Sequence, residues 1–141
     1  MLSWCAVLAL LSAVSLSEAI VQEPDCSQLR GYALDRERRL QLYVNAEVAK
    51  GPSLVNGHRV YECALEAYAA LLLRAPEERA VGVKELGIYP LLFRSSRDSI
   101  PEVFEAWEPA IKKLKASQVG CSYAKNSDGS HLYLCLFKLE Q

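Results

Sequence analysis

The sequence predicts an α/β fold, an α-β-α sandwich in which a small antiparallel sheet lies between helices. Two observations carry this prediction. Residues 118–125 and 131–138 form a hairpin pattern whose second strand is apolar on both faces, so both faces must be covered. Helical patterns over residues 27–49 and 62–74, and from residue 99 onward, supply the covering layers. The length of 141 residues suits one domain.

The first helix is predicted from Ser27 to Ala49. Its apolar residues recur at steps of four and seven and therefore share one face; they are Leu29, Ala33, Leu40, Val44 and Val48. Gly51-Pro52 ends this helix, and Asn56-Gly57 indicates a turn in the loop that follows. A second helix, rich in Ala and Leu, runs from about Glu62 to Arg74.

Residues 87–93 are a short apolar run that predicts a strand, and Pro90 confines this strand to a sheet edge. The third helix begins at Ser99-Ile100-Pro101-Glu102, the pattern of a capping box with proline in the first turn. Pro109 is predicted to break or kink it, with Ala110 to Ala116 forming another short turn of helix.

The C-terminal hairpin is predicted in register. Its loop, Asn126 to Ser130, places Asn, Asp and Gly in the order of a type I turn closed by a left-handed Gly129. If Asn126 faces Ser130, then Cys121 faces Cys135 as a non-hydrogen-bonded pair, with a Cα separation of about 4.5 Å. That separation allows a disulfide. Small residues on one strand then face leucines on the other along the reverse face.

Residues 1–19 are predicted to be a signal peptide, and residues 20–141 the mature domain. The apolar run is too short to span a bilayer and ends in Ser17-Glu18-Ala19, although its start has no Lys or Arg. A buried N-terminal helix is the alternative. No later apolar stretch is long enough to span a membrane. The sequence therefore predicts a secreted, extracellular protein.

Cleavage would leave four cysteines, which predicts two disulfides with three alternative connectivities. Once the hairpin pairs Cys121 with Cys135, elimination pairs Cys26 with Cys63. A different small cystine-bridged domain, such as a protease inhibitor, would instead be indicated by bridges Cys26–Cys135 and Cys63–Cys121.

Charge and residue types exclude several function classes. Without Glu18, the chain has 16 acidic and 16 basic residues, a balance that argues against binding nucleic acid by bulk charge. The sequence has two histidines, His58 and His131, and no Cys-x-x-Cys spacing, so we expect no metal site and no cofactor. Both histidines are predicted to be surface residues rather than catalytic bases. Arg36, Arg38 and Arg39 form a basic patch predicted to be a solvated helix face.

Six segments in order resemble motifs of one known family. They are Ala33 to Leu40 with Val48 to Gly51, Tyr61 to Glu66, Ile88-Tyr89, Ala106-Trp107, Val119 to Ala124, and Leu134 to Phe137. The family is the CAP superfamily of cysteine-rich secretory proteins, venom antigens and pathogenesis-related proteins. The most similar branch is the nematode activation-associated secreted proteins and their divergent, shortened relatives. The resemblance implies the same α-β-α sandwich.

The chain departs from the family's metal-binding cleft, which uses two His and two Glu. Glu37 stands at the position of the first His, and Glu85 is an offset remnant of the Gly-Glu-Asn motif. The segment with the second His is absent, and Trp107 or a deletion takes its place. The resemblance therefore implies a degenerate cleft at Glu37, Glu85 and Trp107 that holds no metal and has no catalytic residue.

These observations predict a secreted, non-enzymatic CAP-like protein of a parasitic nematode. Its expected partner is a host extracellular or cell-surface protein, with immune or haemostatic modulation as the outcome. Three alternatives stay open: a lipid or sterol carrier, a small inhibitor of host proteases, and a hydrolase that uses Glu37 with Glu85. The carrier requires an apolar cavity, and the hydrolase requires the two carboxylates to lie together.

Overall fold

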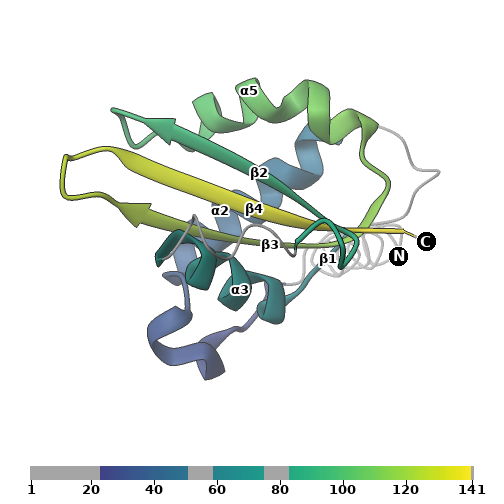
Figure 1. Ribbon diagram of the computed structural model, residues 1–141, viewed down its shortest axis with the longest axis horizontal. Helices are drawn as coiled ribbons and strands as arrows, with labels where there is room; N and C mark the ends of the chain where they lie inside the picture. The colour runs from purple at the N-terminus through teal and green to yellow at the C-terminus, as the bar shows by residue number, and fades with distance from the viewer. Residues whose placement is uncertain (1–22, 51–58, 75–82, 141) are drawn as a thin grey trace, which may run out of the picture.

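A computed structural model describes residues 23–50, 59–74 and 83–140 of the chain. The elements in chain order are η1 (Ser27–Tyr32), α2 (Arg36–Ala49), β1 (Val60–Tyr61), α3 (Cys63–Arg74), β2 (Ile88–Ser95), α5 (Ile100–Lys113), β3 (Ala116–Lys125) and β4 (His131–Leu139). The strands form one sheet in the order β1-β3-β4-β2. Helix α3 covers one face, and α2 and α5 cover the other (Figure 1). The predicted α-β-α sandwich is confirmed.

The β3–β4 hairpin has the predicted register, with Cys121 opposite Cys135. The loop closes as expected, because the Asn126 N–H donates to the Ser130 carbonyl at 2.8 Å and Gly129 has a φ of 88°. The Asp128 carboxylate accepts from the Ser130 N–H at 2.8 Å. The turn chemistry therefore determines which residues of the two strands meet.

Helix α3 lies directly on β3 at Gly120. A Cβ added to this glycine would lie 2.5 Å from both the Glu66 backbone nitrogen and the Leu65 Cβ, which is closer than atoms can approach. The small residue lets the helix approach the sheet. Around this contact the buried residues are Leu65, Ala69, Leu72, Val83, Ile88, Leu134 and Leu136.

The opposite face holds the larger core. Trp107 and Phe104 of α5 pack edge to face, with ring centroids 5.3 Å apart. Each is 5% exposed, and burying one such side chain contributes about 1.5–3 kcal/mol. The Cys121–Cys135 disulfide lies in the same cluster, with a Cα separation of 4.1 Å. The helices on this face are thus fixed to the sheet by aromatic packing around a cystine.

The second disulfide joins Cys26 to Cys63, with Cα atoms 5.4 Å apart. It links the start of η1 to the start of α3. The structure therefore contains the two bridges that the hairpin and elimination predicted. It excludes the pairing Cys26–Cys135 with Cys63–Cys121 that would indicate a different small domain.

The prediction for the first helix was wrong in continuity and in face. Ala33 is extended, with φ −81° and ψ 141°, and α2 begins only after Asp35, whose carboxylate accepts from the Arg38 N–H at 3.0 Å. Val44 and Val48, predicted to be buried, are 39% and 72% exposed. The buried residues are Arg39, Leu42, Ala46 and Ala49. Because the buried face of α2 includes the charged Arg39, hydrophobic periodicity predicted the wrong face of the helix.

The third helix begins where predicted but not by the predicted cap. The Ser99 side chain makes no capping hydrogen bond, and Glu102 is paired with Arg97 instead. Helix α5 continues through Pro109 to Lys113, so the predicted break does not occur. Ile111 is fully buried, which holds the turn after Pro109 against the core.

The two edges of the sheet differ from each other. Strand β2 is an edge strand containing Pro90, as predicted. The other edge is β1, a two-residue strand parallel to β3 that sequence patterns did not indicate. The signal-peptide segment, Gly51-Pro52, Asn56-Gly57 and His58 lie outside the described residues. Among the helices within the described ranges, none is long and apolar enough to cross a membrane.

Candidate functional site

An open groove of about 500 Å³ lies where the start of α2 meets the start of α5. We call it the α2–α5 groove. It is lined by Asp35, Glu37, Arg38, Gln41, Asn45 and residues 98–101. The helical spacing of positions 37, 41 and 45 places them along one side of α2. The wall therefore consists of an exposed glutamate followed by two amide side chains.

The floor of the groove is held by an ion pair between Arg38 and Asp98. Arg38 donates from both terminal nitrogens, at 2.9 Å each, to the two oxygens of Asp98. Tyr133 also donates to Asp98. The hydrogen bonds from Arg38 and Tyr133 hold the pKa of Asp98 well below its usual value, and Asp98 raises that of Arg38. Asp98 is thus a fixed anion at neutral pH.

Aromatic side chains continue this network along the hairpin. The Arg38 guanidinium lies over the Tyr123 ring, 3.7 Å from its centroid, in a cation–π contact. Tyr123 lies against Tyr133, with centroids 5.1 Å apart, and its hydroxyl is 2.5 Å from Nδ1 of His131. Burial raises the pKa of both tyrosines. The groove is therefore linked to the loop end of the hairpin.

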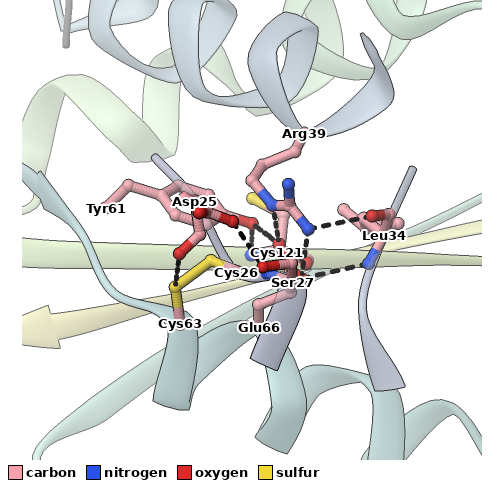
Figure 2. Close-up of a disulfide and its surroundings, with 9 residues drawn as sticks. All are labelled: Asp25, Cys26, Ser27, Leu34, Arg39, Tyr61, Cys63, Glu66 and Cys121. Carbon is pink, nitrogen blue, oxygen red and sulfur yellow. Dashed lines mark hydrogen bonds and ion pairs between the residues drawn. A yellow bond between two sulfur atoms is a disulfide. The ribbon is translucent and has the colours of Figure 1, made fainter. Parts of the chain in front are cut away.

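A second polar cluster, formed by Arg39, Glu66 and Tyr61, is buried (Figure 2). The Glu66 carboxylate is fully buried and accepts from Arg39 Nε at 2.7 Å, from the Tyr61 hydroxyl at 2.5 Å and from the Leu34 N–H at 3.0 Å. Arg39 Nη2 also donates to Glu66 at 3.0 Å and to the Leu34 carbonyl at 2.8 Å. We call this the buried cluster.

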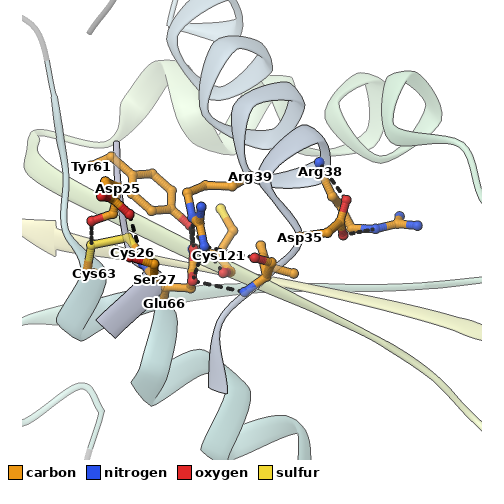
Figure 3. Close-up of polar contacts among 11 residues, drawn as sticks. Asp25, Cys26, Ser27, Asp35, Arg38, Arg39, Tyr61, Cys63, Glu66 and Cys121 are labelled. Carbon is orange, nitrogen blue, oxygen red and sulfur yellow. Dashed lines mark hydrogen bonds and ion pairs between the residues drawn. A yellow bond between two sulfur atoms is a disulfide. The ribbon is translucent and has the colours of Figure 1, made fainter. Parts of the chain in front are cut away.

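The buried cluster joins the two helical layers, because Arg39 is on α2 and Glu66 is on α3. Hydrogen bonding to Glu66 raises the pKa of Arg39, and burial raises the pKa of Tyr61. Four donors surround one carboxylate, which leaves it little capacity for another ligand. The cluster is therefore a structural connection around the β1 edge of the sheet. Figure 3 shows Arg38 and Arg39 leaving α2 in different directions.

The predicted degenerate cleft positions lie in three different settings. Glu37 is exposed on the wall of the α2–α5 groove. Glu85 is exposed in the turn before β2 and is not among the residues that line the groove. Trp107 is buried in the core. The groove thus includes one of the three positions.

The chemistry of the groove suits recognition better than bond cleavage. Asp35 caps α2, and Asp98 is held by Arg38 and Tyr133, so neither is a free base. Across residues 23–50, 59–74 and 83–140, no three His, Cys, Asp or Glu side chains are grouped so that they could hold a metal ion. That no metal is held in solution stays a prediction.

Sequence reasoning missed the partners of the three arginines. Arg36 pairs with Glu23, Arg38 with Asp98 and Arg39 with Glu66, so the predicted solvated patch is wrong for Arg39, which is 5% exposed. One signal was present, because Arg39, Leu42 and Ala46 share helical spacing with Ala49. The distant acids could not be identified from spacing alone.

Comparison with protein families shows the family to which the chain belongs. A family model described as "Ancylostoma-associated secreted protein related" matches residues 26–137, from the first bridged cysteine into β4. The chain belongs to this family. Among curated protein sequences, none matches.

Several solved structures share the fold of this chain. The Ancylostoma-secreted protein Ac-ASP-7 has a TM-score of 0.52 at 19% identity, covering 76% of this chain and 71% of that protein. A manganese-bound form of Ac-ASP-7 gives 0.54 at 18%, covering 79% and 73%. Hookworm platelet inhibitor gives 0.52 at 17%, covering 86% and 76%. At these identities the likeness shows the CAP fold alone.

Proposed function

We propose that this chain is a secreted, non-enzymatic CAP-like protein of a parasitic nematode that binds a host extracellular or cell-surface protein through the α2–α5 groove. The observation that carries the proposal is the groove itself. Its charged floor is already neutralised by the Arg38–Asp98 pair, whereas Glu37 and Gln41 on its wall are exposed. Such a surface offers exposed polar groups to a partner and contains no activated nucleophile among its lining residues.

The absence of an enzyme activity is supported by what the described side chains do. Nucleophilic catalysis requires a nucleophile beside a base that a third group orients. All four cysteines of residues 23–140 are in disulfides, and His131 lies against Tyr123. The alternative Glu37–Glu85 hydrolase would need both carboxylates in one site, and the groove contains only Glu37.

The name of one structural neighbour favours a haemostatic target, because hookworm platelet inhibitor is described as an inhibitor of platelets. Two disulfides and the predicted signal peptide support an extracellular location. The alternative role as a lipid carrier is not favoured at this groove, because its lining is mostly charged or polar and it is open to solvent.

The direct test measures saturable binding of the oxidised chain, residues 20–141 with a fluorescent label, to washed human platelets, leukocytes and an array of purified plasma proteins. Glu37→Arg should weaken binding by about tenfold or more, the effect of losing one charge-assisted contact. Glu105→Arg is the matched control, because Glu105 is also an exposed helix glutamate and does not line the groove.

Glu105→Arg should leave the dissociation constant within about twofold of the unchanged chain. Equal loss in both variants would contradict a role for the groove. No saturable binding to any of the three host preparations would overturn the proposed function.

A further inference from the structure

The sheet has one short edge and one long edge. β1 has two residues, whereas β2 has eight, and β2 pairs only with β4 among the described strands. Proteins normally shorten, charge or cover an edge strand, because its unpaired backbone groups attract another strand. Here the long edge carries only Pro90 and Arg94 as such devices, and its Leu92 is 58% exposed.

The pairing with β4 determines which backbone groups of β2 face outward. The Leu139 N–H donates to the Gly87 carbonyl at 2.8 Å, so odd-numbered residues of β2 bond to β4 and even-numbered residues point away from it. Of those, Pro90 has no N–H, and the Ile88 N–H donates to the Val83 carbonyl at 3.1 Å. The outward N–H groups that remain are those of Leu92 and Arg94, together with the outward carbonyls.

We propose that β2 is the interface of a homodimer, in which a second copy of this chain adds its own β2 antiparallel across a two-fold axis at Leu92. This inference is independent of the proposed function. In that register each Leu92 N–H meets the Leu92 carbonyl of the other copy, and each Arg94 N–H meets the carbonyl of the other copy's Pro90. Every outward N–H is therefore satisfied. Because Pro90 has no N–H, each copy forgoes one hydrogen bond.

Side chains and charge also fit a second copy. The two-fold axis places the exposed Leu92 of each copy against the other, so apolar surface is buried at the centre. Arg94 lies opposite Pro90 and not opposite another arginine. Residues 20–141 carry 16 acidic and 16 basic residues, so net charge does not oppose self-association.

The arrangement is self-limiting. An isologous contact uses the long edge of each copy, and the continuous sheet then ends in β1 on both sides. A two-residue edge offers little to a further strand. The expected product is therefore a closed dimer and not a fibre.

The test is the molar mass of residues 20–141 in solution, measured by sedimentation equilibrium from about 1 to 500 µM, a range that spans weak to moderate dimers. We expect concentration-dependent doubling of the mass. Leu92→Lys, which places two ammonium groups at the axis, should raise the dimer dissociation constant by about tenfold or more. Val48→Lys, at an exposed valine of α2, is the control and should dimerise like the unchanged chain.

Crosslinking gives a second measurement. Leu92→Cys should form a covalent dimer in a glutathione buffer, and Val48→Cys should not, because only position 92 meets itself at the axis. Circular dichroism confirms that each variant is folded. A monomer throughout the concentration range, or a dimer unaffected by Leu92→Lys, would overturn the proposal.

Discussion

Arg38 and Arg39 are neighbours in the sequence, but their side chains form ion pairs in different environments. The side chain of Arg39 is 6% exposed and meets a fully buried glutamate, whereas that of Arg38 is 21% exposed and meets a partly exposed aspartate. Arg39 thus forms an ion pair in the interior, and the preceding residue, Arg38, forms one at the groove. The comparison teaches that a basic run on an amphipathic helix cannot be assigned to solvent as a block.

Disrupting the two ion pairs should also change the free energy of unfolding by different amounts. Removing one partner of a buried pair costs about 3–5 kcal/mol, because the other charge is left without compensation. An exposed pair contributes about 0–1 kcal/mol. Substitutions at Glu66, at Gly120 beside it and at Asp98 test this difference in energy.

The largest effect is expected for Glu66→Gln. This change keeps the shape of the side chain but leaves the Arg39 charge uncompensated, and it should lower the free energy of unfolding by about 3–5 kcal/mol. Urea denaturation followed by circular dichroism measures the loss. Arg39→Met combined with Glu66→Leu should recover part of it, because no buried charge remains, although the Tyr61 hydroxyl and the Leu34 N–H lose their acceptor. A loss below about 1 kcal/mol for Glu66→Gln would mean that the cluster is solvated.

A smaller loss is expected for Gly120→Ala, beside the residue that anchors the buried cluster. The new methyl group would overlap the backbone of Leu65 and Glu66, and overpacking costs about 1–3 kcal/mol. Gly31→Ala is the control, since nothing lies within 4 Å of a Cβ at Gly31. Thermal unfolding of the two variants should separate them. Equal melting temperatures would show that α3 stands further from β3 than described.

The smallest effect is expected for Asp98→Asn, which should cost at most about 1 kcal/mol at neutral pH. The pKa of Asp98 is lower in the folded state than in the unfolded chain. Its stabilising contribution is therefore present above a pH of about 4 and is lost as the pH falls through the folded-state value. Urea unfolding from pH 7 down to pH 2 should show the variant and the unchanged chain converging. A constant difference across that range would contradict the Arg38–Asp98 pair.

The sequence predicted most accurately where local chemistry specifies the geometry. The Asn126-to-Ser130 turn fixed the hairpin register, and with it the Cys121–Cys135 pair. The apolar residues on both faces of the second strand required a covering layer on each face, and the structure contains helices on both. Pro90 likewise identified an edge strand, because proline cannot donate to a second neighbour.

Prediction failed where tertiary contacts override local preference. The face of α2 is set by Arg39, whose partner is 27 residues away, and no hydrophobic pattern detects a buried ion pair. Asp98 is 60 residues from Arg38, so the groove floor could not be assembled from spacing. The capping box at Ser99 failed because Arg97 pairs with Glu102.

The two disulfides also determine what a protease could remove from this protein. A single cut between Cys26 and Cys63 would leave α2 and its three arginines covalently attached to the remainder. A cut after the exposed Lys125, in the hairpin, would likewise leave the central strand β4 tethered to β3 through Cys135. A nicked molecule should therefore run as one species on a non-reducing gel and separate into fragments only after reduction.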